Sequence, residues 1–297
     1  MSKRNWAIVA ATLVSIIYGV TFTIAKDVMP KFVAPFGFIT MRVGGSVVLF
    51  WLISFFGPKE KIAKEDFPRI IAAAVFGVAL NMLTFFKGLS YTSPIMGAVL
   101  MVTTPMIVLV LSAFIMKERM KKRKVFGLLL GLTGTITLIL YGKSVVNAPN
   151  ATLGNLLVFI NAVSYGFYLI LVKKLMDKYN AFTFVKWIYT YGFIMVLPFG
   201  WNEFHAIEWT TIPLDILWKI GFVVVFSTFL TYLLNLVSMR ELKPTTVAVF
   251  IYLQPLFATV FAVGLGKDEL SLIKLLSAVL IFTGVYLVTQ KRVKSDL

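Results

Sequence analysis

Polar side chains recur at helical spacing inside stretches of the sequence that are otherwise apolar. Near residue 230 they are Thr228, Thr231, Tyr232 and Asn235, which lie on one face of a helix because they fall at i, i+3, i+4 and i+7. In a helix surrounded by lipid, such a face lines a cavity or bonds to another helix. The chemistry that hydroxyl and amide groups offer is hydrogen bonding to a solute. Bonding between helices with no solute contact is the alternative.

The same side-chain types occur at matching positions near residues 18 and 165. The members are Tyr18, Thr21, Asn161, Tyr165 and Tyr168. A tyrosine near the end of a membrane-spanning helix anchors at the headgroups. Tyr18 and Tyr165 instead lie in the middle of apolar stretches, so we expect them in a cavity. The adjacent Gly19 and Gly166 are expected to permit close helix packing or flexing.

Two further apolar stretches each contain a proline eleven residues after a first proline. The inner prolines are Pro105 and Pro255. A proline within a helix removes one hydrogen bond and crowds the carbonyl four residues earlier, which here belongs to Met101 or Ile251. In lipid that carbonyl needs a polar partner. We therefore expect two kinked helices that bend between states, a static kink that only shapes a cavity being the alternative.

Side chains on these two helices, and on a third apolar stretch near 68–87, complete the expected cavity. They are Asn81, Phe85, Met101, Thr104, Tyr252 and Gln254. Thr104 and Gln254 each directly precede an inner proline. For Met101 and Phe85 ordinary packing is the alternative. A cavity of aromatic, amide and hydroxyl groups suits an amphipathic solute with an apolar body and a few hydrogen-bonding groups.

Arg42 is the basic residue that lies clearly inside an apolar stretch. Its guanidinium could attract the carboxylate of a substrate. The alternatives are that it extends outward to the headgroups, pairs with Asp27, or bonds to helix-end carbonyls. No aspartate or glutamate lies in the middle of an apolar stretch, which disfavours proton antiport through a carboxylate.

The composition identifies lipid as the main solvent of this chain. Of its 297 residues, 59% are hydrophobic and 14% are charged, which is too apolar for a soluble domain of this length. The chain has no cysteine and one histidine. Disulfides and thiolate or histidine-rich metal sites are therefore excluded, and we expect no cofactor. No metalloprotease motif or buried acid pair is present, so we expect no catalytic residues and no enzyme.

Ten membrane-spanning helices are predicted from stretches of roughly 20 apolar residues. They lie near 6–26, 34–56, 68–87, 94–116, 124–142, 152–173, 182–200, 215–237, 244–266 and 271–290. With the amino terminus inside, twenty lysines and arginines fall on the cytoplasmic side and seven on the other. This asymmetry predicts that both termini are cytoplasmic. It also explains the net charge of +16 without nucleic acid.

The two halves of the sequence resemble each other. Shifting the chain by 150 positions aligns Pro94–Gly134 with Pro244–Gly284, with ten identities that include Pro105/Pro255 and Gly134/Gly284. Because each half holds five helices, the second must insert upside down. The sequence thus predicts an all-α polytopic membrane protein of two inverted five-helix repeats, 1–143 and 144–297. Many secondary transporters are built this way, with substrate near the midplane.

These features together resemble the EamA branch of the drug/metabolite transporter superfamily. The resemblance rests on the inverted halves, the paired prolines, the Tyr-Gly motifs at Tyr18 and Tyr165, and the helix ends at 117–119 and 267–269. It implies a cavity lined by the first, third, fourth, sixth, eighth and ninth helices, with the fifth and tenth as scaffold. It also implies two EamA repeats and a permease of the cell membrane, here a bacterial inner membrane, that exports a metabolite.

The sequence therefore predicts a secondary transporter that moves a small amphipathic metabolite by alternating access. The solute is an amino acid or similar compound, or a drug-like one. A channel or a non-transporting membrane receptor is the alternative. The expected partners are a small-molecule solute and the lipid bilayer. The glycines Gly127, Gly131 and Gly134 indicate close contact between helices. Contact within the fold is the first interpretation, and contact between two copies in a homodimer is the second.

Overall fold

The computed structural model describes residues 2–29, 31–91, 100–119, 121–141, 150–264 and 271–290, and all regular structure within them is helical. The first half comprises α1 (Lys3–Val28), α2 (Pro35–Ser54), η1 (Lys64–Asp66), α3 (Phe67–Ala74), the π-helical segment η2 (Val75–Ala79), α4 (Leu80–Tyr91), α6 (Thr104–Ile115) and α7 (Lys122–Tyr141). The second half comprises α8 (Ala151–Met176), α9 (Ala181–His205), η3 (Trp209–Thr211), α10 (Leu214–Phe222), the π-helical segment η4 (Val223–Leu230), α11 (Thr231–Glu241), α12 (Pro244–Val249), the 3-10 turn η5 (Phe250–Tyr252), α13 (Leu253–Gly264) and α14 (Leu272–Thr289).

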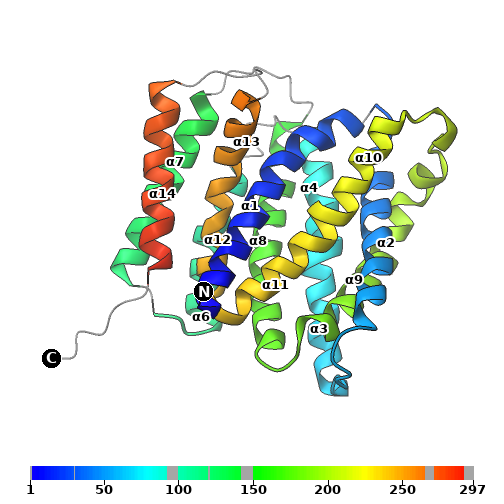
Figure 1. The fold of residues 1–297 in the computed structure, drawn as a ribbon, viewed down its shortest axis with the longest axis horizontal. Coiled ribbons are helices and arrows are strands. Elements are labelled where there is room, and N and C mark those ends of the chain that lie inside the picture. Colours follow the sequence, from blue (N-terminus) through cyan, green and yellow to red (C-terminus); the bar gives the residue numbers. More distant parts are fainter. Residues whose placement is uncertain are drawn as a thin grey trace.

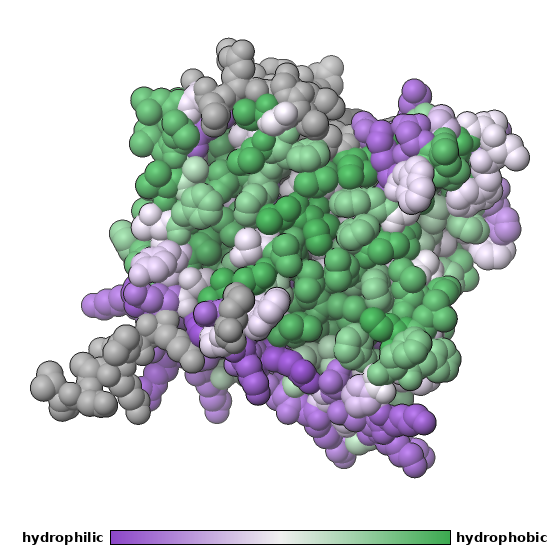
Figure 2. Space-filling model, in the orientation of Figure 1, coloured by the Kyte–Doolittle hydropathy of each residue, from purple (hydrophilic) through white to green (hydrophobic). Residues whose placement is uncertain are grey.

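The described helices confirm the predicted membrane-spanning architecture (Figure 1). Among the described residues, nine helices are long and apolar enough to cross a bilayer, counting Lys64–Gly88, Leu214–Glu241 and Pro244–Phe261 each as one. The remaining predicted helix corresponds to the shorter apolar helix α6, since residues 92–99 before it lie outside the described residues. Figure 2 shows apolar side chains in a broad band across the molecule, with hydrophilic side chains at its two ends.

The start of α1 and the end of α14 lie on the same face of the helix bundle. Arg4 donates a hydrogen bond to the carbonyl of Thr289, which joins these two ends. We call this the terminal face and the opposite one the distal face. An even number of spanning helices places both ends on one side, as the sequence predicts. Which face is cytoplasmic stays a prediction.

Helix pairing repeats between the two halves. Helix α1 of the first half packs against α11 and α13 of the second, and α8 of the second packs against α4 and α6 of the first. The remaining helices form the pairs α2 with α9 and α7 with α14, each joining one half to the other. Figure 1 shows α7 and α14 side by side at one edge of the bundle. This reciprocal pairing is what two inverted repeats produce.

Irregular helical turns also occur at matching positions of the two halves. The 150-residue shift places η2 opposite residues 225–229, which lie within η4. The same shift places Val102, in the turn before α6, opposite Tyr252, the last residue of η5 before α13. Single π-helical turns occur frequently at functional sites. The halves therefore share two breaks as well as their helices.

Two glutamates tie α2 and α9 together in matching ways. Glu203, near the end of α9, accepts hydrogen bonds from the Phe36 and Gly37 amides at the start of α2, at 2.6 and 2.9 Å. Glu60, after the end of α2, accepts one from the Asn180 amide before α9, at 2.8 Å. A carboxylate at a helix N-terminus satisfies free amides and opposes the positive end of the helix dipole. The carboxylate that caps the start of α2 thus comes from α9, and the one that caps the start of α9 comes from the connection after α2.

The glycines of the fifth and tenth spanning helices are used for packing within the chain. A Cβ added at Gly284 of α14 would lie 2.6 Å from both the Gly127 oxygen and the Gly131 nitrogen of α7. A Cβ at Gly134 would lie 2.9 Å from the Ser277 oxygen. Both partners are backbone atoms and have little freedom to move. Small residues allow spanning helices to approach this closely.

We expect Gly284→Ala to lower the free energy of unfolding by about 1–3 kcal/mol, as overpacking of a close contact does. The matched control is Gly221→Ala, because nothing lies within 4 Å of a Cβ added there. Thermal unfolding of the purified variants, followed by the loss of monomer on size-exclusion chromatography, measures the difference. Equal melting temperatures would contradict the packing role.

The absence of cysteine from the sequence allows the orientation to be tested by single-cysteine labelling. Lys174 is exposed at the end of α8 on the terminal face, and Glu208 is exposed in the α9–α10 connection on the distal face. A membrane-impermeant maleimide should label Glu208→Cys in intact cells and Lys174→Cys only after permeabilisation. The reverse pattern would place the termini outside the cell.

Candidate substrate site

Five tyrosines meet in the interior of the bundle. We call Tyr18, Tyr165, Tyr168, Tyr189 and Tyr232 the tyrosine cluster. The Tyr232 ring centroid lies 5.8 Å from that of Tyr168 and 5.0 Å from that of Tyr189. The ring centroids of Tyr165 and Tyr168 lie 5.9 Å apart. The fifth member, Tyr18, accepts a hydrogen bond at 3.3 Å from the hydroxyl of Thr231, the residue next to Tyr232.

The cluster lies where the two halves meet. Tyr232 donates a hydrogen bond to the Gly77 carbonyl of η2 at 2.8 Å. The Tyr168 ring also packs on Gly77, where an added Cβ would lie 2.1 Å from the ring. Phe50 of α2 contacts Tyr189 of α9, with ring centroids 4.6 Å apart. Side chains from both halves therefore pack together at this point.

The polar stripe predicted near residue 230 is buried. Thr228, Thr231, Tyr232 and Asn235 are each 5% exposed or less. The Thr228 hydroxyl donates to the Val223 carbonyl five residues earlier, at 2.8 Å, within the π-helical segment η4. Asn235 makes no side-chain hydrogen bond within the described part of the chain.

Arg42 is held inside the bundle beside the cluster. Its side chain is buried, and its Nε donates to the Thr228 hydroxyl at 3.0 Å. Its guanidinium carbon lies 5.7 Å from the centroid of Phe86. The alternative of pairing with Asp27 is wrong, because Asp27 pairs with Lys219 at 2.8 Å.

Asn81 and Asn161 bond to each other's backbone. The Asn161 side chain donates to the Asn81 carbonyl at 2.6 Å, and the Asn81 side chain donates to the Asn161 carbonyl at 3.4 Å. These bonds join α4 to α8. The Oδ1 atom of Asn161 is buried and has no partner among the described residues. Both asparagines therefore hold helices together, and one retains an unused acceptor.

Both inner prolines occupy the first turn of a helix that follows a break. Pro105 lies in the first turn of α6, and Thr104 donates to the Met101 carbonyl at 2.6 Å. The carbonyl freed by this proline thus receives the partner that lipid demands. Pro255 lies in the first turn of α13, after η5, where Ser15 of α1 donates to the Phe250 carbonyl at 2.8 Å.

The two predicted glycines pack against the helices that these prolines begin. A Cβ added at Gly19 would lie 3.0 Å from the Gln254 oxygen and 3.0 Å from the Ala258 nitrogen of α13. A Cβ added at Gly166 would lie 2.9 Å from Leu111 of α6. The pairing is reciprocal between the halves. Each glycine allows α1 or α8 to approach the helix after the break.

The remaining predicted residues lie outside the tyrosine cluster. Thr21 donates to the Ile17 carbonyl of its own helix at 2.6 Å. Phe85 packs edge-on against Phe86, with centroids 5.3 Å apart. The Tyr252 ring packs on Gly131 of α7, in a second core with Leu128 and Ile281. Met101 is half-buried, and its carbonyl is used by Thr104.

Sequence reasoning did not predict Tyr189 as part of the site. Tyr189 lies in the middle of a predicted spanning helix, as do Tyr18 and Tyr165, so the same argument applies to it. The sequence also places a polar residue, Lys186, three positions before it at helical spacing, so a signal was available. Its hydroxyl and that of Tyr168 are buried without a hydrogen-bond partner in the described residues.

We expect Thr228→Val to lower the free energy of unfolding by about 1–3 kcal/mol, because it leaves the buried Arg42 Nε without this acceptor. Thr228→Ser keeps the hydroxyl and should retain near-wild-type stability. Thermal unfolding of both variants in the same detergent measures the effect. Equal loss in the two would show that the methyl group, and not the hydroxyl, matters.

The chain is similar to known proteins over nearly its whole length. The model of the EamA-like transporter family matches residues 5–140 and 152–290. An uncharacterized transporter of Archaeoglobus fulgidus is 26% identical over 291 residues, which cover 97% of this chain and 100% of the relative. The uncharacterized transporter YoaV of Bacillus subtilis is 27% identical, with 97% of each chain covered.

A solved crystal structure has the same fold, with a TM-score of 0.76, 16% identity and 95% of each chain covered. The family model accounts for both halves of the bundle. The chain therefore belongs to the EamA-like transporter family and is a multi-pass membrane transporter of a small-molecule solute.

Proposed function

We propose that this transporter exports a small amphipathic metabolite, an amino acid or a compound of similar character, drug-like molecules included. The tyrosine cluster, Arg42 and Asn235 form its binding site in this proposal. The observation that carries it is the set of buried polar groups without partners among the described residues. Tyr168 and Tyr189 contribute these hydroxyls. Asn235, which is 4% exposed, adds an amide near them.

The chemistry of these groups defines the class of solute. Buried polar groups are normally hydrogen-bonded, so unused ones at the contact of two halves favour a ligand that supplies the partners. Aromatic rings from Tyr232, Tyr168 and Phe50 favour an apolar body. The guanidinium of Arg42 favours an anionic group such as a carboxylate. A solute that combines these features is amphipathic.

Contacts at the terminal face support alternating access between the two predicted repeats, 1–143 and 144–297. Asp66 of the first repeat is buried and accepts hydrogen bonds from Lys178 and, at 2.7 Å, from the Tyr179 hydroxyl of the second. The pKa of the Lys178 ammonium is raised, mainly because Asp66 accepts its hydrogen bond. Glu118 likewise accepts from Thr245 at 3.2 Å.

Contacts at the distal face join the same two repeats. Asp27 pairs with Lys219 at 2.8 Å, and Glu203 holds the start of α2. In our proposal, the carrier releases one face at a time, so that the site opens to one side only. The breaks before Pro105 and Pro255, with Gly19 and Gly166 beside them, are where we propose that the helices bend.

Two substitutions test the site. Asn235→Ala and Tyr165→Ala should each reduce transport about tenfold, since one buried hydrogen bond or ring contact is worth about 1 kcal/mol or more. Val237→Ala is the matched control, because Val237 lies on the same helix as Asn235 and is 40% exposed. Flux in proteoliposomes is measured alongside the amount of folded protein. Unchanged flux in both variants would remove this assignment.

The same flux assay separates a carrier from a channel. Flux that saturates with solute concentration and shows counterflow supports alternating access, whereas unsaturable conductance contradicts it. The solute itself is found by growth rescue against toxic amino acids and their analogues. A strain expressing the protein should survive better than one expressing Asn235→Ala if export is the direction of transport.

A further inference from the structure

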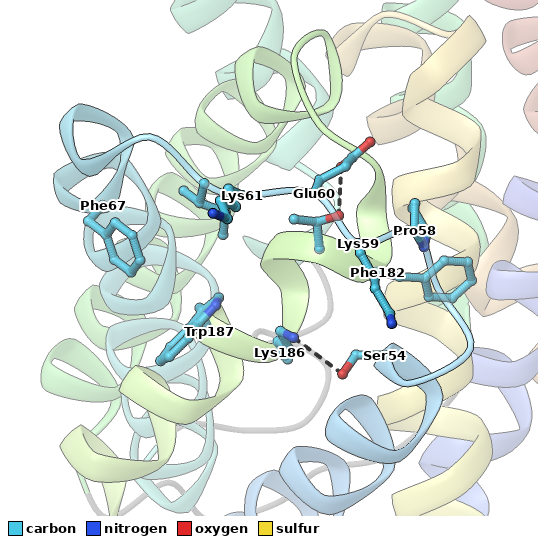
Figure 3. A pocket seen from close by; sticks show the side chains of 11 residues that line it. Ser54, Pro58, Lys59, Glu60, Lys61, Phe67, Phe182, Lys186 and Trp187 are labelled. Carbon is cyan, nitrogen blue, oxygen red and sulfur yellow. Dashed lines mark hydrogen bonds between the residues drawn. The ribbon is translucent and has the colours of Figure 1, made fainter.

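A hollow of about 430 Å³ opens at the terminal face, between the end of α2 and the start of α9. Figure 3 shows the side chains around it. The residues that matter here are Ser54, Lys59, Lys61, Phe67, Lys186 and Trp187. They come from three separate segments: α2 with the connection after it, α3, and α9. This hollow is distinct from the tyrosine cluster.

The hollow has an excess of positive charge. Lys59 and Lys61 are exposed, and Lys186 is half-buried, with its ammonium 3.3 Å from the Ser54 hydroxyl. Its one lining carboxylate, Glu60, already accepts a hydrogen bond from the Thr183 hydroxyl at 2.6 Å (Figure 3). It also accepts one from the Asn180 amide at 2.8 Å. Within the described residues none of the three lysines has a salt bridge.

Aromatic side chains place the hollow at the boundary between lipid and water. The Trp51 and Trp187 rings lie edge to face, with centroids 5.3 Å apart, and the Lys186 ammonium lies 4.5 Å from Trp51. Tryptophans are enriched where spanning helices reach the headgroups. Phe55 and Phe56, beside the hollow at the end of α2, are 74% and 92% exposed. Acyl chains are the natural neighbours of such exposed rings.

The hollow of the distal face lacks this excess charge. It is lined by two lysines and two aspartates, and Lys219 is paired there with Asp27 at 2.8 Å and with Asp215 at 3.4 Å. The difference between the faces matches the predicted orientation. Anionic lipids and the basic pockets that bind them are found on the cytoplasmic side.

We propose that the hollow between α2 and α9 binds the phosphate group of an anionic phospholipid. Lys59, Lys61 and Lys186 surround the phosphate in this proposal. The acyl chains of the lipid extend along the exposed rings of Phe55 and Phe56. Free inorganic phosphate shares the chemistry of the headgroup but makes no use of these rings, which is why the lipid is the occupant that the surface fits.

The test is lipid binding by the full-length purified protein, read by native mass spectrometry. Phosphatidylglycerol and phosphatidylcholine are titrated in parallel in a neutral detergent. The variant K59Q/K61Q/K186Q removes the three charges and keeps a polar side chain at each position. It should bind phosphatidylglycerol at least about tenfold more weakly than the wild type, because each lysine near an anionic surface contributes appreciably.

The matched control is K121Q/K122Q/K174Q, which removes three exposed lysines from the same face but away from the hollow. It should bind phosphatidylglycerol like the wild type. Equal loss in the two triple variants, or equal binding of phosphatidylcholine and phosphatidylglycerol by the wild type, would overturn the proposal.

A footprint on the wild-type protein tests the site without any variant. Phosphatidylglycerol should protect Lys59, Lys61 and Lys186 from acetylation, and phosphatidylcholine should not. Inorganic phosphate that protects these lysines as well as phosphatidylglycerol does would show a free-anion site, and would overturn the lipid assignment.

Discussion

The structure depends on one requirement of the bilayer, that every backbone polar group in lipid finds a partner inside the protein. Regular helices meet it by themselves, and irregular turns do not. At each of the four breaks η2, η4, η5 and the turn before α6, within the described residues, a hydroxyl side chain bonds a carbonyl. The donors and carbonyls are Thr228 with Val223, Ser164 with Phe76, Thr104 with Met101, and Ser15 with Phe250.

This requirement draws polar groups to the centre of the bundle. Two of the four bonds lie within one helix and two cross from α1 or α8 to a helix of the other half. Because the breaks occupy matching positions in inverted halves, they approach the same central region from opposite faces. The tyrosine cluster lies at that meeting point, with Tyr232 bonded to the Gly77 carbonyl of η2. The uninterrupted helices α7 and α14 pack against each other instead, as a scaffold would.

Charge follows the opposite rule and gathers at the two faces. Glu60 and Glu203 cap the starts of α9 and α2, and Asp66 and Asp27 pair with lysines of the other half. Arg42 is the charged side chain that lies deep in the bundle, beside the tyrosine cluster, and Thr228 is its acceptor. Burying a charged side chain inside the membrane costs free energy, and such side chains are usually functional. For this reason we include Arg42 in the proposed site.

The sequence by itself determined the features that depend on position along one chain. Apolar length predicts the helices, loop charge predicts their orientation, and the 150-residue shift predicts the repeat and its breaks. The partnership of Thr104 with the Met101 carbonyl was also foreseeable, because both lie in one helical turn. The burial of the Thr228–Asn235 stripe followed from its helical spacing.

Tertiary structure decided everything that depends on which helices are neighbours and how each is rotated. Spacing alone cannot tell that Asn81 bonds to Asn161, that Arg42 reaches Thr228, or that Tyr252 turns toward Gly131 while Tyr189 joins the cluster. These contacts join residues far apart in the sequence. Their partners are fixed by the packing of whole helices, so the physical information that selects them exists only once the bundle has formed.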